Sequence, residues 1–272
     1  MSGGKVVTEV KGAPVSADAK GAAAETEKKK GIPGSVLKLI AIITMFIDHA
    51  AAVLIEMGYF KVNEAAAENN TGVIVLDFVM RSIGRIAFPI FCFLLVEGYV
   101  HTRSKWKYLR NLIIFGLISE VPFDLAFQGG PLVLTYNNVY FNLMFSLLMM
   151  ICWDKITKGS FKESGVATRI MAISMVIVIA ALATVTFTDY YCFGPLLVFF
   201  MFIFRGKKLP MFLSGLVVLF ITGITELFAL VDYALFFNYN GQRGRQRKML
   251  FYLFYPVHLS ILVLIRYLIF RV

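Results

Sequence analysis

The chain has few residues of the kinds on which soluble enzymes depend. Only 16% of its 272 residues are charged, and it contains 3 cysteines and 3 histidines. The cysteines are odd in number and scattered, which excludes a disulfide framework, and no metal-ligand spacing occurs, so we expect no metal site. The motifs GxSxG, P-loop and HExxH are missing too. Serine hydrolysis, nucleotide hydrolysis and zinc-protease chemistry therefore have no local support.

Apolar residues take the place of the missing charges. They make up 58% of the chain, and the mean hydropathy is +0.74. Soluble domains are nearer 45–50% apolar, so the composition indicates an integral membrane protein in a lipid bilayer. A net charge of +10 could suggest nucleic-acid binding. However, the basic residues lie in short clusters between apolar runs, which is typical of membrane topology signals, and we predict no nucleic-acid partner.

The hydropathy pattern divides the chain into two parts. Residues 1–35 have almost no large apolar side chain and show no signal-peptide pattern, which predicts a disordered tail on the cytoplasmic side. Residues 36–272 predict one transmembrane domain, an all-α polytopic bundle of about eight spans, with nine or ten as the alternative. We expect it in the cytoplasmic (inner) membrane. The expected spans are 36–57, 73–100, 108–127, 139–156, 170–187, 191–204, 209–230 and 249–270.

Loop charges favour a cytoplasmic N-terminus. Loops 101–107, 157–169 and 205–208 are basic and alternate with loops that are acidic or uncharged. The exception is 240–248, NGQRGRQRK, which eight spans place outside in spite of its four basic residues. Either a span is miscounted there, or function or packing holds those arginines.

Polar residues inside the apolar segments indicate a functional site. A charged side chain near the bilayer centre costs about 2.5–3.5 kcal/mol, so such residues normally face a protein interior or a wet cavity. Independent spans place theirs at one depth, which predicts a buried polar chamber. These residues are Asp48, His49, Arg81, Arg85, Glu120, Asp124, Asn138 and His258.

The chemistry that suits such a chamber is proton transfer. A histidine exchanges a proton near neutral pH, and a neighbouring carboxylate can set its tautomer, so His49 is the candidate base and Asp48 its orienting partner. Arginines can hold an anionic group such as a phosphate. The structural alternatives stay open: Arg85 could pair with Asp48 or Asp124 to join helices. Similarly, His258 could be an interfacial hydrogen bonder.

Several stretches resemble a known family. They are LKLIAIITMFIDHAAAVL, MRSIGRIAFPIFCFLLVEGYVHTRSKWKYLRNLIIFGLISEVPFDLAF, NNVYFNL, TDYYCFG, YNGQRG and FYLFYPVHLSIL, in this order from about residue 36 to the C-terminus. The sequence is similar to the TraX family. That resemblance implies an inner-membrane protein associated with acetylation of the pilin N-terminus in conjugative systems. It also implies a relation to the acyltransferase-three transmembrane acyltransferases.

The resemblance assigns expected roles. It implies acetyl-CoA as co-substrate, with His49 in IDHA at the place of a catalytic histidine in the first span. The acyl acceptor would be an amine or hydroxyl on pilin or a cell-surface glycan. Residues expected to bind substrate or cofactor are Arg81, Arg85, Glu97, Glu120, Asp124, Asn138, His258 and Arg243.

Other function classes remain open at this point. For Glu97 with His101, an interfacial pair at the end of the second span is the alternative to a substrate contact. A proton-coupled transporter would also carry acids and histidines in its spans. A non-catalytic pilus or conjugation factor would use them to lock helices together.

Overall fold

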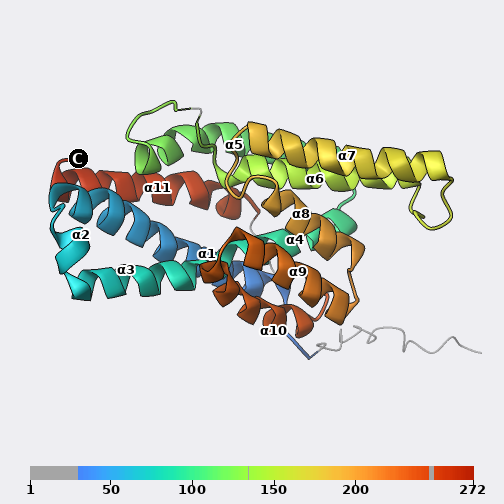
Figure 1. Cartoon of the computed structure of the whole chain (residues 1–272), viewed down its shortest axis with the longest axis horizontal. Helices are drawn as coiled ribbons and strands as arrows, with labels where there is room; N and C mark the ends of the chain where they lie inside the picture. The colour runs from blue at the N-terminus through green and yellow to red at the C-terminus, as the bar shows by residue number, and fades with distance from the viewer. Residues whose placement is uncertain (1–29, 134, 245–247) are drawn as a thin grey trace, which may run out of the picture. The chain divides into compact units, whose positions relative to one another are not determined.

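A computed structural model describes residues 30–133, 135–244 and 248–272. Of the tail predicted for residues 1–35, positions 1–29 lie outside the described residues. Residues 31–272 form one compact unit, and within the described part of the chain it contains helices and no β-strand. The all-α prediction is confirmed (Figure 1). The elements are α1 (Gly34–Ala50), η1 (Ala51–Phe60), α2 (Ala66–Asn69), α3 (Thr71–Gly84), α4 (Ala87–His101), α5 (Lys105–Phe127), α6 (Val139–Thr157), α7 (Val166–Val185), α8 (Phe193–Ile203), α9 (Lys208–Thr222), η2 (Ile224–Val231), α10 (Asp232–Phe237) and α11 (Lys248–Phe270).

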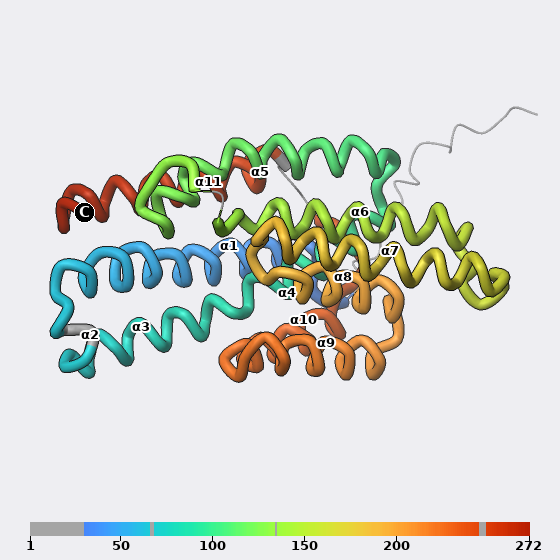
Figure 2. Tube along the Cα trace, turned by 45° about the horizontal axis from the view of Figure 1, so that its top comes forward, coloured from blue at the N-terminus to red at the C-terminus, as the bar shows by residue number. Residues whose placement is uncertain are grey.

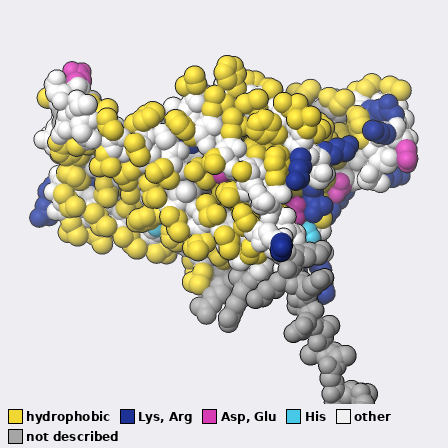
Figure 3. All heavy atoms as spheres, turned by 90° about the horizontal axis from the view of Figure 1, so that it is seen from below, with side chains coloured by type: hydrophobic (Ala, Val, Ile, Leu, Met, Phe, Trp, Pro, Cys, Tyr) yellow, Lys and Arg dark blue, Asp and Glu magenta, His cyan; other side chains and the backbone are white. Residues whose placement is uncertain are grey.

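Long apolar helices confirm the membrane-type bundle. Five helical segments are long and apolar enough to cross a membrane, and α8 and α9 are shorter apolar helices. In Figure 3, apolar side chains cover most of the visible face, whereas Lys and Arg gather mainly toward one end. This distribution fits a surface that contacts lipid along its length and water at its ends. The five segments are 34–60, 71–101, 139–157, 166–185 and 249–270.

The two ends of the bundle are set by α1 and α11, which run in the same direction. Near the beginning of α1, the Lys38 amine lies 4.9 Å from the ring centre of Phe251, at the beginning of α11. At the other end, the Phe270 ring packs on Gly58. We call these ends the Gly34 end and the Phe60 end. The α6–α7 hairpin is visible in both ribbon views (Figures 1 and 2).

The single span predicted for 209–230 is wrong. The helix α9 ends at Thr222, and after Gly223, with φ at +155°, the chain reverses into η2 and α10. Gly215 of α9 packs against the Tyr233 side chain of α10, so the two segments form a hairpin. A glycine at the turn is expected because side chains disfavour that backbone conformation.

The hairpin explains the basic stretch that the eight-span topology left on the outside. Because α10 returns to the Gly34 end, residues 239–242 lie beside 31–34. Ile32 pairs with Tyr239, and the Gly34 amide donates to Gln242 O over 2.8 Å. The described part of this stretch therefore lies at the same end as the beginning of α1. The prediction that placed it outside failed because one reversal was missed.

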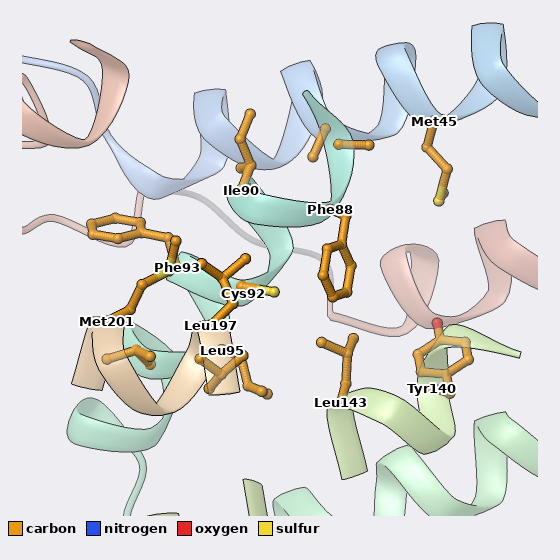
Figure 4. Packing of buried hydrophobic residues seen from close by; sticks show 14 of the residues in the cluster. Met45, Phe88, Ile90, Cys92, Phe93, Leu95, Tyr140, Leu143, Leu197 and Met201 are labelled. Atoms are coloured by element: carbon orange, nitrogen blue, oxygen red, sulfur yellow. The ribbon is translucent and has the colours of Figure 1, made fainter. Parts of the chain in front are cut away.

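The predicted span 73–100 consists of two helices, α3 and α4, separated at Arg85 and Ile86. The separation follows a close contact between helices: a Cβ added to Gly84 would overlap the Asp48 side chain of α1. Only glycine allows this approach, which brings the RSIGR segment to the end of α1, next to its junction with η1. Beneath the contact, α4 packs into the core through Phe88, Ile90 and Cys92 (Figure 4).

Candidate functional site

Two histidines from opposite ends of the sequence meet in the bundle. His49 Nδ1 lies 2.7 Å from His258 Nε2, and the two rings are nearly parallel, with centroids 5.0 Å apart. Tyr255 contacts both rings edge-on. The second nitrogen of His49, Nε2, has no hydrogen-bond partner among the residues that the structure describes. The site therefore contains an imidazole nitrogen whose hydrogen-bonding capacity is unused among the described residues.

Asp48 does not orient the His49 ring as predicted. Its carboxylate binds Arg81, with 2.7 Å between Oδ2 and Nη1. Consecutive residues on a helix point about 100° apart, so Asp48 faces α3 whereas His49 faces α11. Arg81 is shared with Glu56, whose Oε1 lies 3.1 Å from its Nε. Asp48 thus belongs to a helix-joining ion network next to the histidine pair.

Arg85 is paired with a residue that the sequence did not single out. Its Nη1 lies 2.9 Å from Glu226 Oε1, which belongs to η2. The alternative reading of Arg85 as a helix-joining residue is supported, but its partner is neither Asp48 nor Asp124. Arg81 and Arg85 both bind carboxylates, so an anionic substrate group would have to compete for them.

A strained loop between α7 and α8 completes the polar cluster. Tyr190 and Tyr191 have positive φ angles of 62° and 45°. The Tyr190 ring stacks on Phe88, with centroids 3.8 Å apart, and its hydroxyl side lies among Arg85, Glu226 and Asp189. Strained backbone in a non-glycine residue costs about 1–3 kcal/mol and is concentrated at functional sites.

Asp189, in the same loop, accepts a hydrogen bond from the Tyr136 hydroxyl over 2.6 Å. The segment before α6 is joined to this loop by backbone hydrogen bonds of Asn137 with Phe187 and Asp189. Burial raises the pKa of the Asp189 carboxyl above its ordinary value. This loop contributes Asp189 and Tyr190 to the polar cluster.

Carboxylates outnumber arginines in this region. Around Arg81 and Arg85 lie five acidic side chains that interact electrostatically with one another and with the arginines. Buried oxygens of Asp48 (Oδ1) and Glu226 (Oε2) have no hydrogen-bond partner among the described residues. Such oxygens favour a ligand that donates hydrogen bonds. The five acids are Asp48, Glu56, Asp77, Asp189 and Glu226.

The other predicted site residues on α5 form an adjacent group. The Asn138 side chain donates to Glu120 and to Gly116 O, and it also caps the beginning of α6. Asp124 accepts from Gln128 over 2.6 Å and from the Val133 amide over 2.8 Å. Tyr255 interacts electrostatically with Glu120 and Asp189, and its ring contacts both histidines, so it links this group to the histidine pair.

Glu97 and Arg243 lie away from the histidines, toward the Gly34 end. Glu97 is buried and accepts two hydrogen bonds from Arg205, of 2.6 and 3.2 Å, and also lies beside His101. It lies ten residues along α4 from Ala87, the first residue after the Arg85–Ile86 break, a rise of roughly 15 Å. Arg243 lies 3.5 Å from Gly98 O. Whether either residue contacts substrate stays a prediction.

Some residues of the cluster had a signal in the sequence. Glu226 is the only charged residue of the apolar run 209–230, and Glu56 follows Asp48 by two helical turns. Tyr190 belongs to TDYYCFG, one of the stretches that carry the family resemblance. No group of three potential metal ligands occurs among the described residues.

The fold and this cluster together define a polytopic helical membrane protein with a buried histidine–carboxylate site. The family model described as TraX protein matches residues 33–266, and the chain belongs to this family. It is 27% identical to a probable fimbrial assembly protein FimC, serogroup H1, of Dichelobacter nodosus, over 83% of this chain and 92% of the relative. No solved structure gives a significant match.

Proposed function

We propose that this protein transfers the acetyl group of acetyl-CoA to an amine inside the membrane, with His49 as the general base. The observation that supports this most directly is the geometry of His49. One ring nitrogen is held by His258 and the other has no partner among the described residues. Family membership and the histidine's place in the first membrane helix support the same reading.

In the proposed step, the amine nitrogen attacks the thioester carbonyl while His49 Nε2 accepts the amine proton. A carbon–nitrogen bond forms, the carbon–sulfur bond breaks, and the thiolate leaves with the electron pair of that bond. The imidazolium then returns the proton to the thiolate, which gives an amide and free CoA. Hydrogen-bond donors near the carbonyl, such as the Tyr190 hydroxyl, would stabilise the charge that develops on oxygen.

The surplus of acids favours an amine over a hydroxyl or an anionic acceptor. Five carboxylates against two guanidinium groups attract the ammonium form of the amine, and the unpartnered oxygens of Asp48 and Glu226 can accept its hydrogen bonds. In the proposal one of these carboxylates takes the first proton from the ammonium group, which leaves the neutral amine that attacks the thioester and gives its second proton to His49. The name of the Dichelobacter relative supports a pilus subunit as the source of that amine. A glycan hydroxyl would gain less from the same carboxylates.

The basic Gly34 end suits the phosphates of acetyl-CoA. Glu97 with Arg205 and the segment that contains Arg243 meet there. We assign this end to the cytoplasm, in keeping with the positive-inside rule. Acetyl-CoA would then enter from the Gly34 end and the acceptor amine from the Phe60 end.

Proton-coupled transport is a second candidate, favoured by one observation. Asp232 of α10 is fully buried, and neither of its carboxylate oxygens has a partner among the described residues. Acids of this kind are proton carriers in many transporters. A transporter would move solute in response to a pH gradient without consuming acetyl-CoA.

The test is acetyl transfer by the purified protein in nanodiscs. The acceptors are a peptide with a free N-terminal amine, the same peptide with that amine blocked, and a short glycan. We expect transfer to the free amine alone, and His49→Ala should lower kcat by about 10²–10⁴-fold, the usual contribution of a general base. The control is Ser164→Ala in the turn before α7, whose hydroxyl donates to Ser160 O, and it should leave transfer intact.

Retention of wild-type turnover by His49→Ala would exclude this histidine from the chemistry. If folded wild-type protein neither binds acetyl-CoA nor transfers its acetyl group, the proposal that this protein is an acetyltransferase is rejected. The same nanodiscs would then be assayed for proton-driven solute uptake, with Asp232→Asn as the variant expected to abolish it.

A further inference from the structure

His258 has contacts on both ring nitrogens that determine its protonation pattern. Its Nδ1 lies 2.7 Å from the carbonyl oxygen of Phe254. A carbonyl oxygen only accepts hydrogen bonds, so His258 Nδ1 carries a proton and donates it. In a neutral ring the other nitrogen, Nε2, then has a lone pair and must accept.

That acceptor is the atom next to His49. Because His258 Nε2 accepts, His49 Nδ1, at 2.7 Å, must donate and carry the proton. The lone pair of neutral His49 then lies on Nε2, the nitrogen without a partner among the described residues. The direction of the hydrogen bonds thus runs from His49 through His258 to a backbone carbonyl.

We infer that His258 is the positioning residue of this site: it holds His49 in the Nδ1-protonated tautomer and leaves Nε2 as the base. This role rests on the proposed function and assigns to an imidazole the part that a carboxylate plays in many catalytic triads. When His49 gains a proton, both of its nitrogens donate, and the bond to His258 Nε2 persists.

The surroundings of His258 keep its ring in place. The Phe254 ring stacks on it with centroids 4.6 Å apart, and Phe46 of α1 packs against it at 6.3 Å. The side chain is 3% exposed. An acceptor held this firmly selects one tautomer of its neighbour, whereas a mobile or hydrated acceptor would allow both.

The experiment reads the tautomer directly by nitrogen-15 NMR of histidine-labelled protein in nanodiscs. The chain has only 3 histidines, so His101→Gln leaves the signals of the pair alone. We expect His49 to be protonated on Nδ1 and not on Nε2. In His258→Phe, which keeps an aromatic ring on Phe254, His49 should become a mixture of both tautomers. In His258→Gln, whose side-chain oxygen can accept from Nδ1, the single tautomer should return.

Acetyl transfer supplies the second measurement. His258→Phe should lower kcat by about 2–10-fold, because only the fraction of His49 that keeps its lone pair on Nε2 can act as the general base, with KM for acetyl-CoA unchanged, and His258→Gln should restore much of it. The inference fails if wild-type His49 carries its proton on Nε2, or if His258→Phe leaves the tautomer unchanged. A wild-type protein that shows the expected tautomer but no transfer would reject the acetyltransferase and retain the tautomer assignment.

Discussion

The contact between Gly84 and Asp48 allows a sharp test of how α3 and α1 hold the site together. Glycine within a helix is usually destabilising by about 0.5–1 kcal/mol relative to alanine, so Gly84→Ala would ordinarily raise stability. Here the added Cβ would overlap the Asp48 side chain. Overpacking of this kind costs about 1–3 kcal/mol, and movement of α3 would also lengthen the 2.7 Å Arg81–Asp48 ion pair.

The two effects oppose each other, and the overlap should dominate. We expect Gly84→Ala to destabilise the protein by about 1–2 kcal/mol, which lowers the Tm by roughly 2–8 °C for a domain of this size. Differential scanning fluorimetry in one detergent measures the shift. The matched control is Gly72→Ala in the first turn of α3, where the nearest atom to an added Cβ is Asn70 Oδ1 at 3.6 Å. This variant should have an unchanged or higher Tm.

A double-mutant cycle isolates the cause. Asp48→Gly removes the whole Asp48 side chain, including the Cβ atom that an alanine at position 84 would overlap. In that background Gly84→Ala should no longer destabilise, because the overlap is gone while the gain in helix propensity remains. If Gly84→Ala is as stable as Gly72→Ala in the native background, the close approach of the two helices is not as described.

Two further variants test the packing around the site. Pro256 has no amide hydrogen, so the carbonyl oxygen of Tyr252 lacks its helical donor and accepts instead from the Tyr140 hydroxyl, 3.0 Å away. Tyr140→Phe should therefore lower the free energy of unfolding by about 1–3 kcal/mol, and an unchanged Tm would show that water satisfies the carbonyl. Glu97→Gln should lower the free energy of unfolding by about 1 kcal/mol or less, because the Arg205 side chain is 41% exposed and solvent screens its ion pair with Glu97. The destabilisation should become smaller at high salt, and a destabilisation that does not depend on salt would contradict an ionic origin.

Much of the helical organisation could be predicted from the sequence because the bilayer constrains it strongly. A stretch of about 20 apolar residues has few stable states in lipid other than a helix, so the helices around 36–57, 139–156 and 249–270 were found near their observed places. The break after Thr222 was missed because Gly223 stands within one long, mainly apolar run. Hydropathy cannot distinguish one crossing from a hairpin of two shorter helices.

The polar site was predicted in its members but not in its pairings. An ionisable side chain is costly in lipid whatever its partner, so composition alone marks His49, Arg81, Arg85 and His258 as residues of a protein interior. Their partners depend on which helix faces lie together. Sequence neighbours such as Asp48 and His49 suggested one pair, and the helical rotation of about 100° per residue separated them.

The sequence by itself determined that this is a helical membrane protein with ionisable groups in its interior, because transfer energies depend only on residue type and run length. Only the tertiary structure decided that His258, 209 residues distant in the chain, holds the ring of His49, and that Glu226 binds Arg85. Hydrogen bonds act over about 3 Å and depend on direction, so their assignment required the packing of α1, α3, η2 and α11.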